Sequence, residues 1–306
     1  MSEQKAVVFS VERFAIHDGQ GLRTTVFFKG CPLHCAWCHN PEGISRQRQV
    51  LYRRQDCIHC GNCQGCSEAG GIESIDGNIQ VNRQCPEHWA DLLDNCPSGA
   101  LCWDSRQVSV GQLLAEVLRD EAFFRHGGGV TVSGGEPLLQ AEFVQVFLRR
   151  LRQEGIHTAM ESSLHAPRSQ LVKVLPELDQ LYADCKLFDS AQHRYWTGHG
   201  NEQILNNIRW LLQSDFRERV VIRTPMIPGI TAESDNIAAI AGFLSKCWPD
   251  VHYELLNYNP LAPAKYPQVG KVYCFQKNSV RYSRAEMEER AALARAQGLT
   301  KVTIDE

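Results

Sequence analysis

Residues 16–43 read IHDGQGLRTTVFFKGCPLHCAWCHNPEG, in which a short apolar run leads directly into three cysteines. The run Thr24–Phe28 is β-branched and aromatic, which predicts a strand. Cys31, Cys35 and Cys38 follow with the spacing C-x3-C-x2-C. We therefore expect a strand that carries three thiols into one loop.

Downstream of residue 105, predicted strands alternate with predicted helices. The expected strands are 129–132, 156–160, 178–184, 220–223 and 252–256. The expected helices are 110–124, 140–154, 202–213, 234–246 and 284–297. This alternation predicts βαβ units and a parallel sheet. With Thr24–Phe28 it gives about six units, whereas a closed barrel has eight. The predicted fold is therefore α/β, a partial and open (β/α)6 barrel.

Composition narrows the class of protein. The chain has 13 cysteines among 306 residues, an odd number in a chain too long to need disulfides, which favours metal or redox chemistry. Basic and acidic residues number 32 and 35, so the formal charge of −3 provides no basic excess for nucleic acid or anionic lipid. The sequence shows no long apolar run and no signal peptide. We expect no membrane association and a cytoplasmic location.

The first three cysteines allow two kinds of metal site. Three thiolates at this spacing can bind three irons of a [4Fe–4S] cluster and leave the fourth iron open to a substrate. The alternative is zinc, with His34 or His39 as the fourth ligand. Spacing alone leaves both open.

Five motifs in a fixed order resolve this choice. They are Asp18–Arg23, Cys31–Glu42, Gly134–Pro137, Asp184–Lys186 and Pro228–Gly229. In this order the chain resembles the glycyl-radical-enzyme activating enzymes, a branch of the radical S-adenosylmethionine (SAM) superfamily related to pyruvate formate-lyase activase. The resemblance covers essentially the whole chain and favours the [4Fe–4S] cluster over zinc.

The resemblance implies a reaction and its partners. SAM binds the open iron through its amino and carboxylate groups, and one electron from the cluster cleaves its C–S bond. The resulting 5′-deoxyadenosyl radical abstracts hydrogen from a glycine in the C-terminal loop of a partner glycyl radical enzyme. Flavodoxin or ferredoxin is the expected electron donor, and the activating enzyme is expected to be a monomer. The alternatives are a radical SAM enzyme acting on a small molecule or another maturation target, and an electron-transfer protein.

The same resemblance assigns residues to SAM. Lys186, oriented by Asp184, meets the SAM carboxylate, and Cys185 between them is expected to be a small apolar filler at this cofactor segment. Trp37 and His39, on either side of Cys38, are expected to line the adenine. Gly134, Gly135 and Glu136 are assigned to the SAM ammonium, and Glu161 and Ser162 to a monovalent cation beside SAM. Arg223 is assigned to the glycyl loop, with a structural salt bridge as the alternative.

Two departures from the family pattern bear on the partner. Gln20 replaces the usual proline of the first motif, and Leu22 its usual isoleucine. Asn257-Tyr258-Asn259 stands where the formate-lyase activase has Pro-Tyr-His, so Asn259 must contact SAM differently. This argues for a dehydratase- or lyase-type partner, an eliminase, rather than pyruvate formate-lyase.

Residues 49–104 interrupt the alternation and predict an insert between barrel segments 1–48 and 105–306. Cys57, Cys60 and Cys63 match the first three ligands of a bacterial ferredoxin motif. Cys96, which precedes a proline, is the leading fourth ligand. We expect a ferredoxin-like insert with a second [4Fe–4S] cluster that relays electrons or folds the segment; a zinc knuckle is the alternative. Three further cysteines of the insert, Cys66, Cys85 and Cys102, are expected either to have no part in the cluster or to replace one of its four ligands. Cys66 is the alternate ligand.

Overall fold

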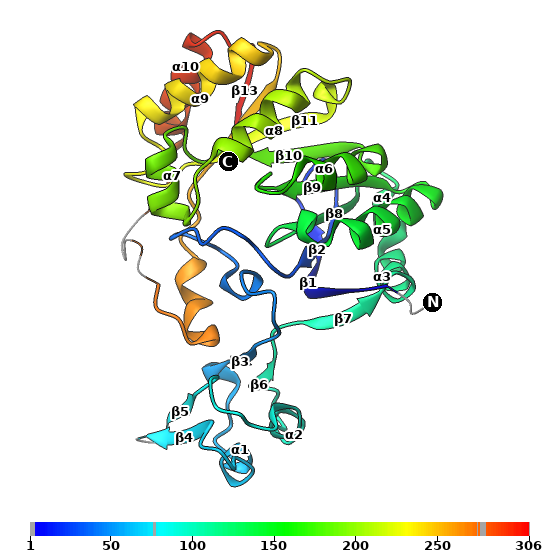
Figure 1. Ribbon diagram of the computed structural model, residues 1–306, viewed down its shortest axis with the longest axis vertical. Helices are drawn as coiled ribbons and strands as arrows, with labels where there is room; N and C mark the ends of the chain where they lie inside the picture. Colours follow the sequence, from blue (N-terminus) through cyan, green and yellow to red (C-terminus); the bar gives the residue numbers. More distant parts are fainter. Residues whose placement is uncertain (1–3, 76–77, 274, 276–279, 306) are drawn as a thin grey trace.

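One large open sheet forms the centre of the computed structural model, which describes residues 4–75, 78–273, 275 and 280–305 (Figure 1). Its nine strands follow the order β13-β12-β11-β10-β9-β8-β2-β1-β7. Neighbouring strands pair in parallel from β2 to β13, whereas β1 pairs antiparallel with both β2 and β7. The strands are β1 Lys5–Ala15, β2 Arg23–Phe28, β7 Arg106–Ser109, β8 Gly129–Gly134, β9 His157–Ser162, β10 Gln180–Asp184, β11 Val220–Pro225, β12 His252–Leu256 and β13 Lys301–Ile304.

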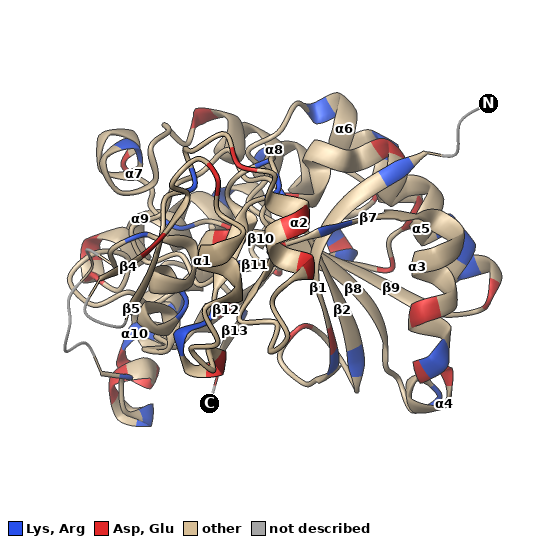
Figure 2. Ribbon diagram, turned by 90° about the horizontal axis from the view of Figure 1, so that it is seen from below, with Lys and Arg blue, Asp and Glu red and all other residues tan. Residues whose placement is uncertain are grey.

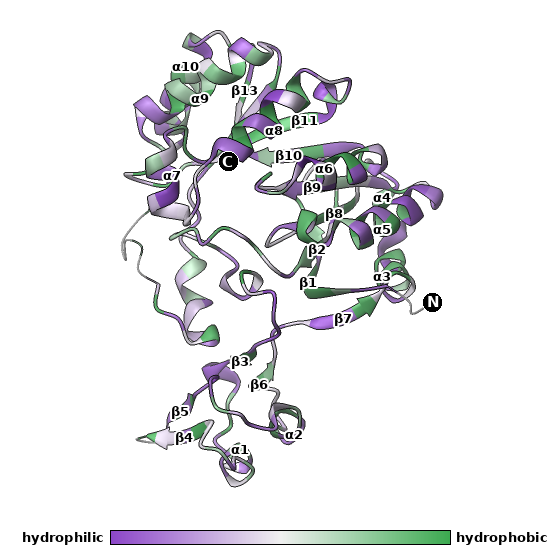
Figure 3. Cartoon of the chain, in the orientation of Figure 1, coloured by the Kyte–Doolittle hydropathy of each residue, from purple (hydrophilic) through white to green (hydrophobic). Residues whose placement is uncertain are grey.

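Helices cover one face of this sheet. In α5, apolar residues recur three and four positions apart and are buried, from Phe143 to Leu151, so one face of the helix joins the main core (Figure 3). Ser109 and Ser283 form capping boxes that begin α3 and α10. The helices are α3 Val110–Val117, α4 Glu121–Phe124, α5 Ala141–Gln153, α6 Arg168–Val174, α7 Ser190–Thr197, α8 Glu202–Leu212, α9 Ser234–Cys247 and α10 Arg284–Ala296.

The opposite face of the sheet is polar. Successive residues of a strand point to opposite faces, so the neighbours of the core residues lie together on this second face. There the guanidinium of Arg23 donates to the hydroxyl of Thr131 at 2.6 Å, and that of Arg223 donates to Glu161 at 2.7 Å. A sheet covered by helices on one side and lined by charged groups on the other has its concave face available for a ligand.

The open parallel α/β sheet confirms the predicted fold class, with differences in detail. Strands β1, β7 and β13 are additional to the predicted set, as are helices α6 and α7. The predicted helix 110–124 is interrupted, because a 3-10 turn at Leu118–Asp120 separates α3 from α4. There the buried carboxylate of Asp120 accepts a hydrogen bond from the hydroxyl of Thr24 at 2.8 Å, which holds this turn against β2.

Residues 49–104 lie beside the sheet and have a small core of their own (Figure 1). Its elements are β3 Val50–Tyr52, α1 Asn62–Gly65, β4 Ile72–Ile75, β5 Asn78–Val81, α2 Trp89–Asp94 and β6 Leu101–Trp103. Its core residues are Val50, Cys63, Ile72, Leu92, Leu93 and Leu101.

A buried ion pair joins the neck of this insert to the barrel. The ammonium of Lys29, which follows β2, lies 2.6 Å from the carboxylate of Asp104, and both side chains are 0% exposed. Asp104 also accepts from the backbone N–H of Gln49 at 3.0 Å, while its own N–H donates to the Gln49 carbonyl at 2.9 Å. The two ends of the insert are therefore clasped together directly beside the three-cysteine loop.

Among the residues described, no helix is long and apolar enough to cross a bilayer. Figure 2 shows basic and acidic residues interspersed over the helices rather than segregated by sign. This distribution agrees with the near-neutral charge of the chain.

Candidate active site

The loop that carries Cys31, Cys35 and Cys38 follows β2 and is closed by backbone hydrogen bonds. The N–H of Cys31 donates to the carbonyl of Ile44 at 2.9 Å, and the N–H of Cys38 donates to the carbonyl of Cys35 at 3.0 Å. The first contact holds the two ends of the loop together, and the second makes a tight turn between the last two thiols. The three cysteines thus belong to one compact loop, as the sequence predicts.

A second apolar core lies behind this loop. Cys35 packs against it, and the hydroxyl of Tyr266 donates to the Cys38 carbonyl at 3.1 Å. Trp37 is 4% exposed within it, so its ring supports the loop from behind. The contact of Trp37 with the adenine stays a prediction. The core consists of Trp37, Leu187, Ile227, Ile230, Tyr258, Ala262, Tyr266, Tyr273 and Phe275.

The three thiols fit an iron–sulfur cluster. Burial raises the pKa of Cys31 and Cys35, and it raises that of Cys38 to about 12, so the loop favours neutral thiols unless a cationic group binds. In the part of the chain that the structure describes, no three His, Cys, Asp or Glu side chains are grouped to hold a single metal ion. A four-iron cluster has no such requirement, because each thiolate binds a different iron. Three thiols on one loop are therefore a donor set that such a cluster can use.

Lys186 and Asp184 lie close to these thiols at the end of β10. The two side chains form an ion pair, with Lys186 11% exposed. Burial by itself would lower the pKa of Lys186, but the negative charge of Asp184 and its hydrogen bond to the ammonium outweigh burial and raise that pKa. The charges of Lys186 and Asp184 also act on the pKa of Cys35, which lies close by. A permanently charged ammonium beside the thiol loop is suited to hold an anionic group such as a carboxylate.

The Gly134–Pro137 segment approaches the same loop through its backbone. The N–H of Glu136 donates to the carbonyl of Gly30 at 2.7 Å. A Cβ atom at Gly135 would lie 2.2 Å from that Gly30 oxygen and 2.6 Å from the Gly43 oxygen, so only glycine fits. The backbone of this segment remains a candidate for the SAM ammonium.

The side chain of Glu136 has several hydrogen-bond partners within the chain. It is 0% exposed, and its carboxylate accepts hydrogen bonds from the hydroxyls of Ser162 at 2.8 Å and Ser163 at 2.6 Å. The backbone N–H groups of Ser163 and Leu138 complete this shell. The carboxylate therefore joins the ends of β8 and β9, and a direct contact with the SAM ammonium, which stays a prediction, would have to share oxygens that already have partners.

Glu161 and Ser162 are likewise engaged within the chain. Glu161 accepts hydrogen bonds from Arg223 at 2.7 Å and from the Ser133 hydroxyl at 2.6 Å. Its pKa is raised to about 7, chiefly by burial and then by the negative charge of Asp18, with Arg223 opposing both. The Ser162 hydroxyl donates to Glu136. A cation at this position would have to share oxygens that already have partners.

Arg223 forms the salt bridge that the sequence allowed as the alternative. It is 5% exposed, and its guanidinium also donates to Glu254 at 2.5 Å. The same group lies 3.7 Å from the centre of the Tyr182 ring. Arg223 therefore holds two carboxylates on the concave face of the sheet.

The other predicted SAM residues divide into two groups. Burial lowers the pKa of His39, which is hydrogen-bonded to the backbone of Asn259, so these two lie together beside the cysteine loop. The Asn259 side chain is exposed and accepts from the N–H of Leu261 at 3.0 Å. Cys185 is 1% exposed within the main core, which agrees with a small apolar filler. Its place among the cofactor residues stays a prediction.

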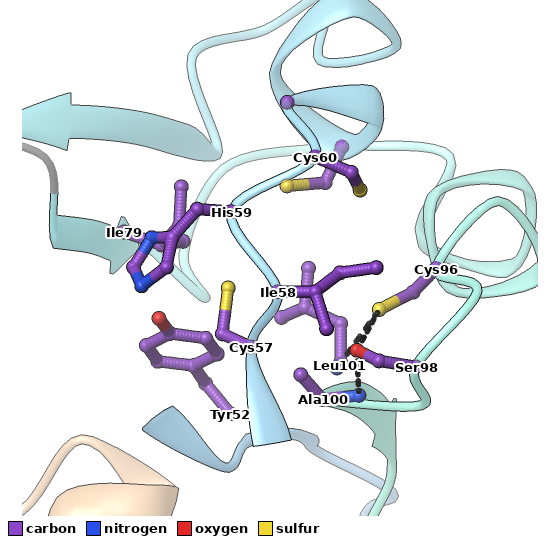
Figure 4. Close-up of a pocket in the computed structure, with 12 residues that line it drawn as sticks. Tyr52, Cys57, Ile58, His59, Cys60, Ile79, Cys96, Ser98, Ala100 and Leu101 are labelled. Carbon is purple, nitrogen blue, oxygen red and sulfur yellow. Dashed lines mark hydrogen bonds between the residues drawn. The ribbon is translucent and has the colours of Figure 1, made fainter. Parts of the chain in front are cut away.

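The insert brings four cysteines to one cavity (Figure 4). Burial alone would raise the pKa of Cys96, but hydrogen bonds from the Leu101 N–H and the Ser98 hydroxyl outweigh it and lower that pKa. Cys66 is exposed and does not line the cavity. The cysteines that line it are Cys57, Cys60, Cys63 and Cys96.

Some residues of the site were not predicted from the sequence. Ser133 and Ser163 hold the carboxylates of Glu161 and Glu136, and each directly adjoins a predicted motif. Their signal is a hydroxyl at the carboxyl end of a predicted strand. Tyr266 and Lys265 donate hydrogen bonds to Cys38 and Asn40, respectively. Both lie more than two hundred residues from the loop in the sequence, and no neighbouring motif indicates that they contact it.

A model of the radical SAM superfamily matches residues 25–240, a span from the strand before the cysteine loop to helix α9. The chain belongs to this superfamily. Its cofactors are therefore a [4Fe–4S] cluster and SAM, and the zinc alternative for the first motif is set aside.

Comparison with individual proteins places the chain within a narrower group of this superfamily. It is 36% identical over 310 residues to the indoleacetate decarboxylase activating enzyme of Tractidigestivibacter scatoligenes, with 96% of each chain covered. It is 36% identical over 303 residues to the choline trimethylamine-lyase activating enzyme of Oleidesulfovibrio alaskensis, again with 96% of each covered. With the (2S)-3-sulfopropanediol sulfolyase activating enzyme of Bilophila wadsworthia it shares 37% over 276 residues, covering 89% of this chain and 91% of that one. This radical SAM enzyme is thus one of the activating enzymes of glycyl radical enzymes.

Proposed function

We propose that this activating enzyme serves a lyase- or decarboxylase-type glycyl radical enzyme, and that Cys31, Cys35 and Cys38 hold its catalytic cluster. The names of its relatives support the class of partner, since they include a decarboxylase, a trimethylamine-lyase and a sulfolyase. Their identities to this chain span only 36% to 37%, so they support a class and not a single partner. Asn259 in place of the formate-lyase activase histidine supports the same class.

The observation that carries the residue roles is the closeness of Lys186 to the thiol loop. When bound, the cluster and SAM supply the 5′-deoxyadenosyl radical that abstracts hydrogen from the partner's glycine. Lys186 would hold the SAM carboxylate, and the backbone at Gly134 and Gly135 would receive the ammonium. The aromatic core behind Trp37 would keep water from the loop.

The open, polar face of the sheet is proposed to receive the glycyl loop. A peptide backbone carries one donor and one acceptor per residue, so it needs polar partners when it leaves water. Arg223, Glu254 and Tyr182 lie on this face. Because Arg223 is fully paired, its proposed role is to hold the two carboxylates in place rather than to bind the loop by charge alone.

The insert is proposed to be a ferredoxin-like unit, residues 49–104, with a second [4Fe–4S] cluster on Cys57, Cys60, Cys63 and Cys96. Their convergence on one cavity supports this, as does the lowered pKa of Cys96. The Lys29–Asp104 clasp would keep the insert at a fixed position beside the catalytic loop. A fixed separation is what a relay of electrons to that loop requires.

Several finer points complete the proposal. Flavodoxin or ferredoxin would donate the electron, and the enzyme would act as a monomer in the cytoplasm. A monovalent cation beside SAM is also proposed, because the carboxyl groups of Asp18 and Glu161 lie close enough for the charge of Asp18 to raise the pKa of Glu161.

The test is an anaerobic incubation of the reduced, reconstituted enzyme with SAM and each of several glycyl radical enzymes. We expect a glycyl radical signal in the paramagnetic resonance spectrum of a lyase- or decarboxylase-type partner. The Cys35→Ala variant should give none. A signal in pyruvate formate-lyase with none in the eliminases would overturn the proposed partner class. SAM cleavage by Cys35→Ala at the parental rate would overturn the ligand assignment.

A further inference from the structure

The last turn of helix α7 is hydrogen-bonded to the cysteine loop. The N–H of His34 donates to the carbonyl of Thr197 at 2.8 Å, and the N–H of Ala36 donates to the carbonyl of Trp196 at 3.0 Å. The last four carbonyls of a helix have no partner inside it, so they are available to a neighbouring segment. Here that segment consists of the two residues on either side of Cys35.

His193 holds this turn in shape from within the helix. Its Nδ1 lies 2.6 Å from the carbonyl oxygen of His199, just beyond the helix end. The Thr197 hydroxyl donates to the His193 carbonyl at 2.8 Å and lies 3.0 Å from Nδ1. Gly198 ends the helix with a φ of 88°, so the chain reverses within the bonds that His193 and Thr197 make.

The imidazole is suited to this bond rather than to filling space. A carbonyl can only accept, so Nδ1 must carry the proton and donate it to His199. Nε2 of the same ring is then an acceptor. His193 is 1% exposed, and among the residues that the structure describes no group donates a hydrogen bond to this Nε2. A side chain that only filled the core would be better apolar, because an unsatisfied buried acceptor is destabilising. The Nδ1 bond therefore explains why a histidine occupies this position.

We infer that His193 is a positioning residue for the catalytic cluster. By fixing the turn Trp196–His199, it fixes the two carbonyls that hold His34 and Ala36, and so the position of Cys35 between them. The inference rests on the proposed assignment of Cys35 as a cluster ligand. It goes beyond that assignment because it gives a role to a residue that does not contact the cluster.

The test compares two substitutions that separate the ring nitrogens. The amide nitrogen of asparagine can occupy the place of Nδ1, whereas the longer glutamine side chain places its amide near Nε2. We expect His193→Gln to raise the hydrogen-exchange rate of the His34 and Ala36 amides in the reconstituted enzyme about fivefold, the factor for one hydrogen bond of about 1 kcal/mol. His193→Asn should restore the parental rate. Gln192→Ala, an exposed change on the same helix, is the matched control.

A second readout reports on the cluster itself. The paramagnetic resonance spectrum of the reduced, SAM-bound cluster should shift in His193→Gln and return to the parental form in His193→Asn. Parental exchange rates and spectra in a folded His193→Gln enzyme would overturn the inference. If His193→Gln does not fold, the Thr197→Val variant replaces it. The inference is then overturned if the His34 and Ala36 amides of Thr197→Val exchange at the parental rate. Absence of iron from the parental loop would instead overturn the proposed function, which separates the two failures.

Discussion

At the scale of single residues, Lys186 offers the sharpest test of SAM binding. Replacing it with alanine removes a charge-assisted hydrogen bond of roughly 1.5–3 kcal/mol. We therefore expect SAM affinity to fall on the order of ten- to a hundredfold. Both clusters should remain, because Lys186 binds no metal in this assignment. The measurement is a SAM titration of the reduced enzyme followed by paramagnetic resonance.

The adjacent Cys185 provides the control for that titration. Its side chain is 1% exposed in the main core, and burial raises its pKa to about 12, so it is a neutral thiol among apolar neighbours. Cys185→Ala should bind SAM as the parent does, with only a modest loss of stability from the small cavity. If Cys185→Ala lost a cluster while Lys186→Ala bound SAM normally, the two roles would be reversed.

Glu161 predicts a dependence of stability on pH. Its pKa of about 7 in the folded chain lies above the ordinary value of 4.5. The stability that this group contributes is therefore complete below about pH 4.5 and is lost as the pH rises through about 7. Glu161→Gln has no such loss, so its free energy of unfolding should rise relative to the parent between about pH 5 and pH 8.

Denaturant unfolding of both proteins across that range measures the difference, which should change by up to about 1.4 kcal/mol per pH unit. Glu218→Gln is the control, since its side chain is 67% exposed. A parent–variant difference that stays constant across the range would show that Glu161 titrates as an ordinary carboxylate.

At the scale of elements, Gly135 shows how one loop depends on another. A Cβ there would lie 2.2 Å from the Gly30 carbonyl and 2.6 Å from that of Gly43, which lie on either side of the cysteine loop. Gly135→Ala should therefore displace that loop at a cost of about 1–3 kcal/mol and release the catalytic cluster. The expected result is loss of about half the iron, with the insert cluster retained.

Gly242→Ala is the matched control for iron content. Gly242 lies within α9, where an added Cβ would meet only a side-chain oxygen of Gln297 at 3.7 Å. Alanine in the interior of a helix should be stabilising by up to about 1 kcal/mol. Full iron content in Gly135→Ala would mean that the backbone contact between these loops does not hold the cluster.

At the scale of the whole molecule, the two cysteine groups predict two independent clusters. The anaerobically reconstituted parent should hold about eight irons. Cys57→Ala or Cys96→Ala should leave about four and keep SAM binding at the catalytic loop. Cys66→Ala should retain all of them, because Cys66 is exposed and lies outside the cavity. Iron analysis giving about twelve in the parent, or zinc in the insert, would contradict this arrangement.

The sequence alone determines the class of this protein. Apolar residues recur every two residues in a strand and about every 3.6 residues in a helix wherever one face of the element is buried. The alternation of these two patterns beyond residue 105 therefore predicts the parallel sheet. The spacing of Cys31, Cys35 and Cys38 and the order of the five motifs identify the family, because a metal loop and a glycine-rich loop each need fixed residues at short separations. The periodicity and the motifs each involve residues close together in the sequence, so they can be recognised without knowledge of the fold.

The tertiary structure alone decides how the charged side chains are used. Glu136 and Glu161 look alike in the sequence, each at the end of a strand, yet one is enclosed by serines and the other is paired with Arg223. The bonds of His34 and Ala36 to α7 join segments about 160 residues apart. Such contacts depend on which strands become neighbours in the sheet, and that is set by the burial of the whole core rather than by any single motif.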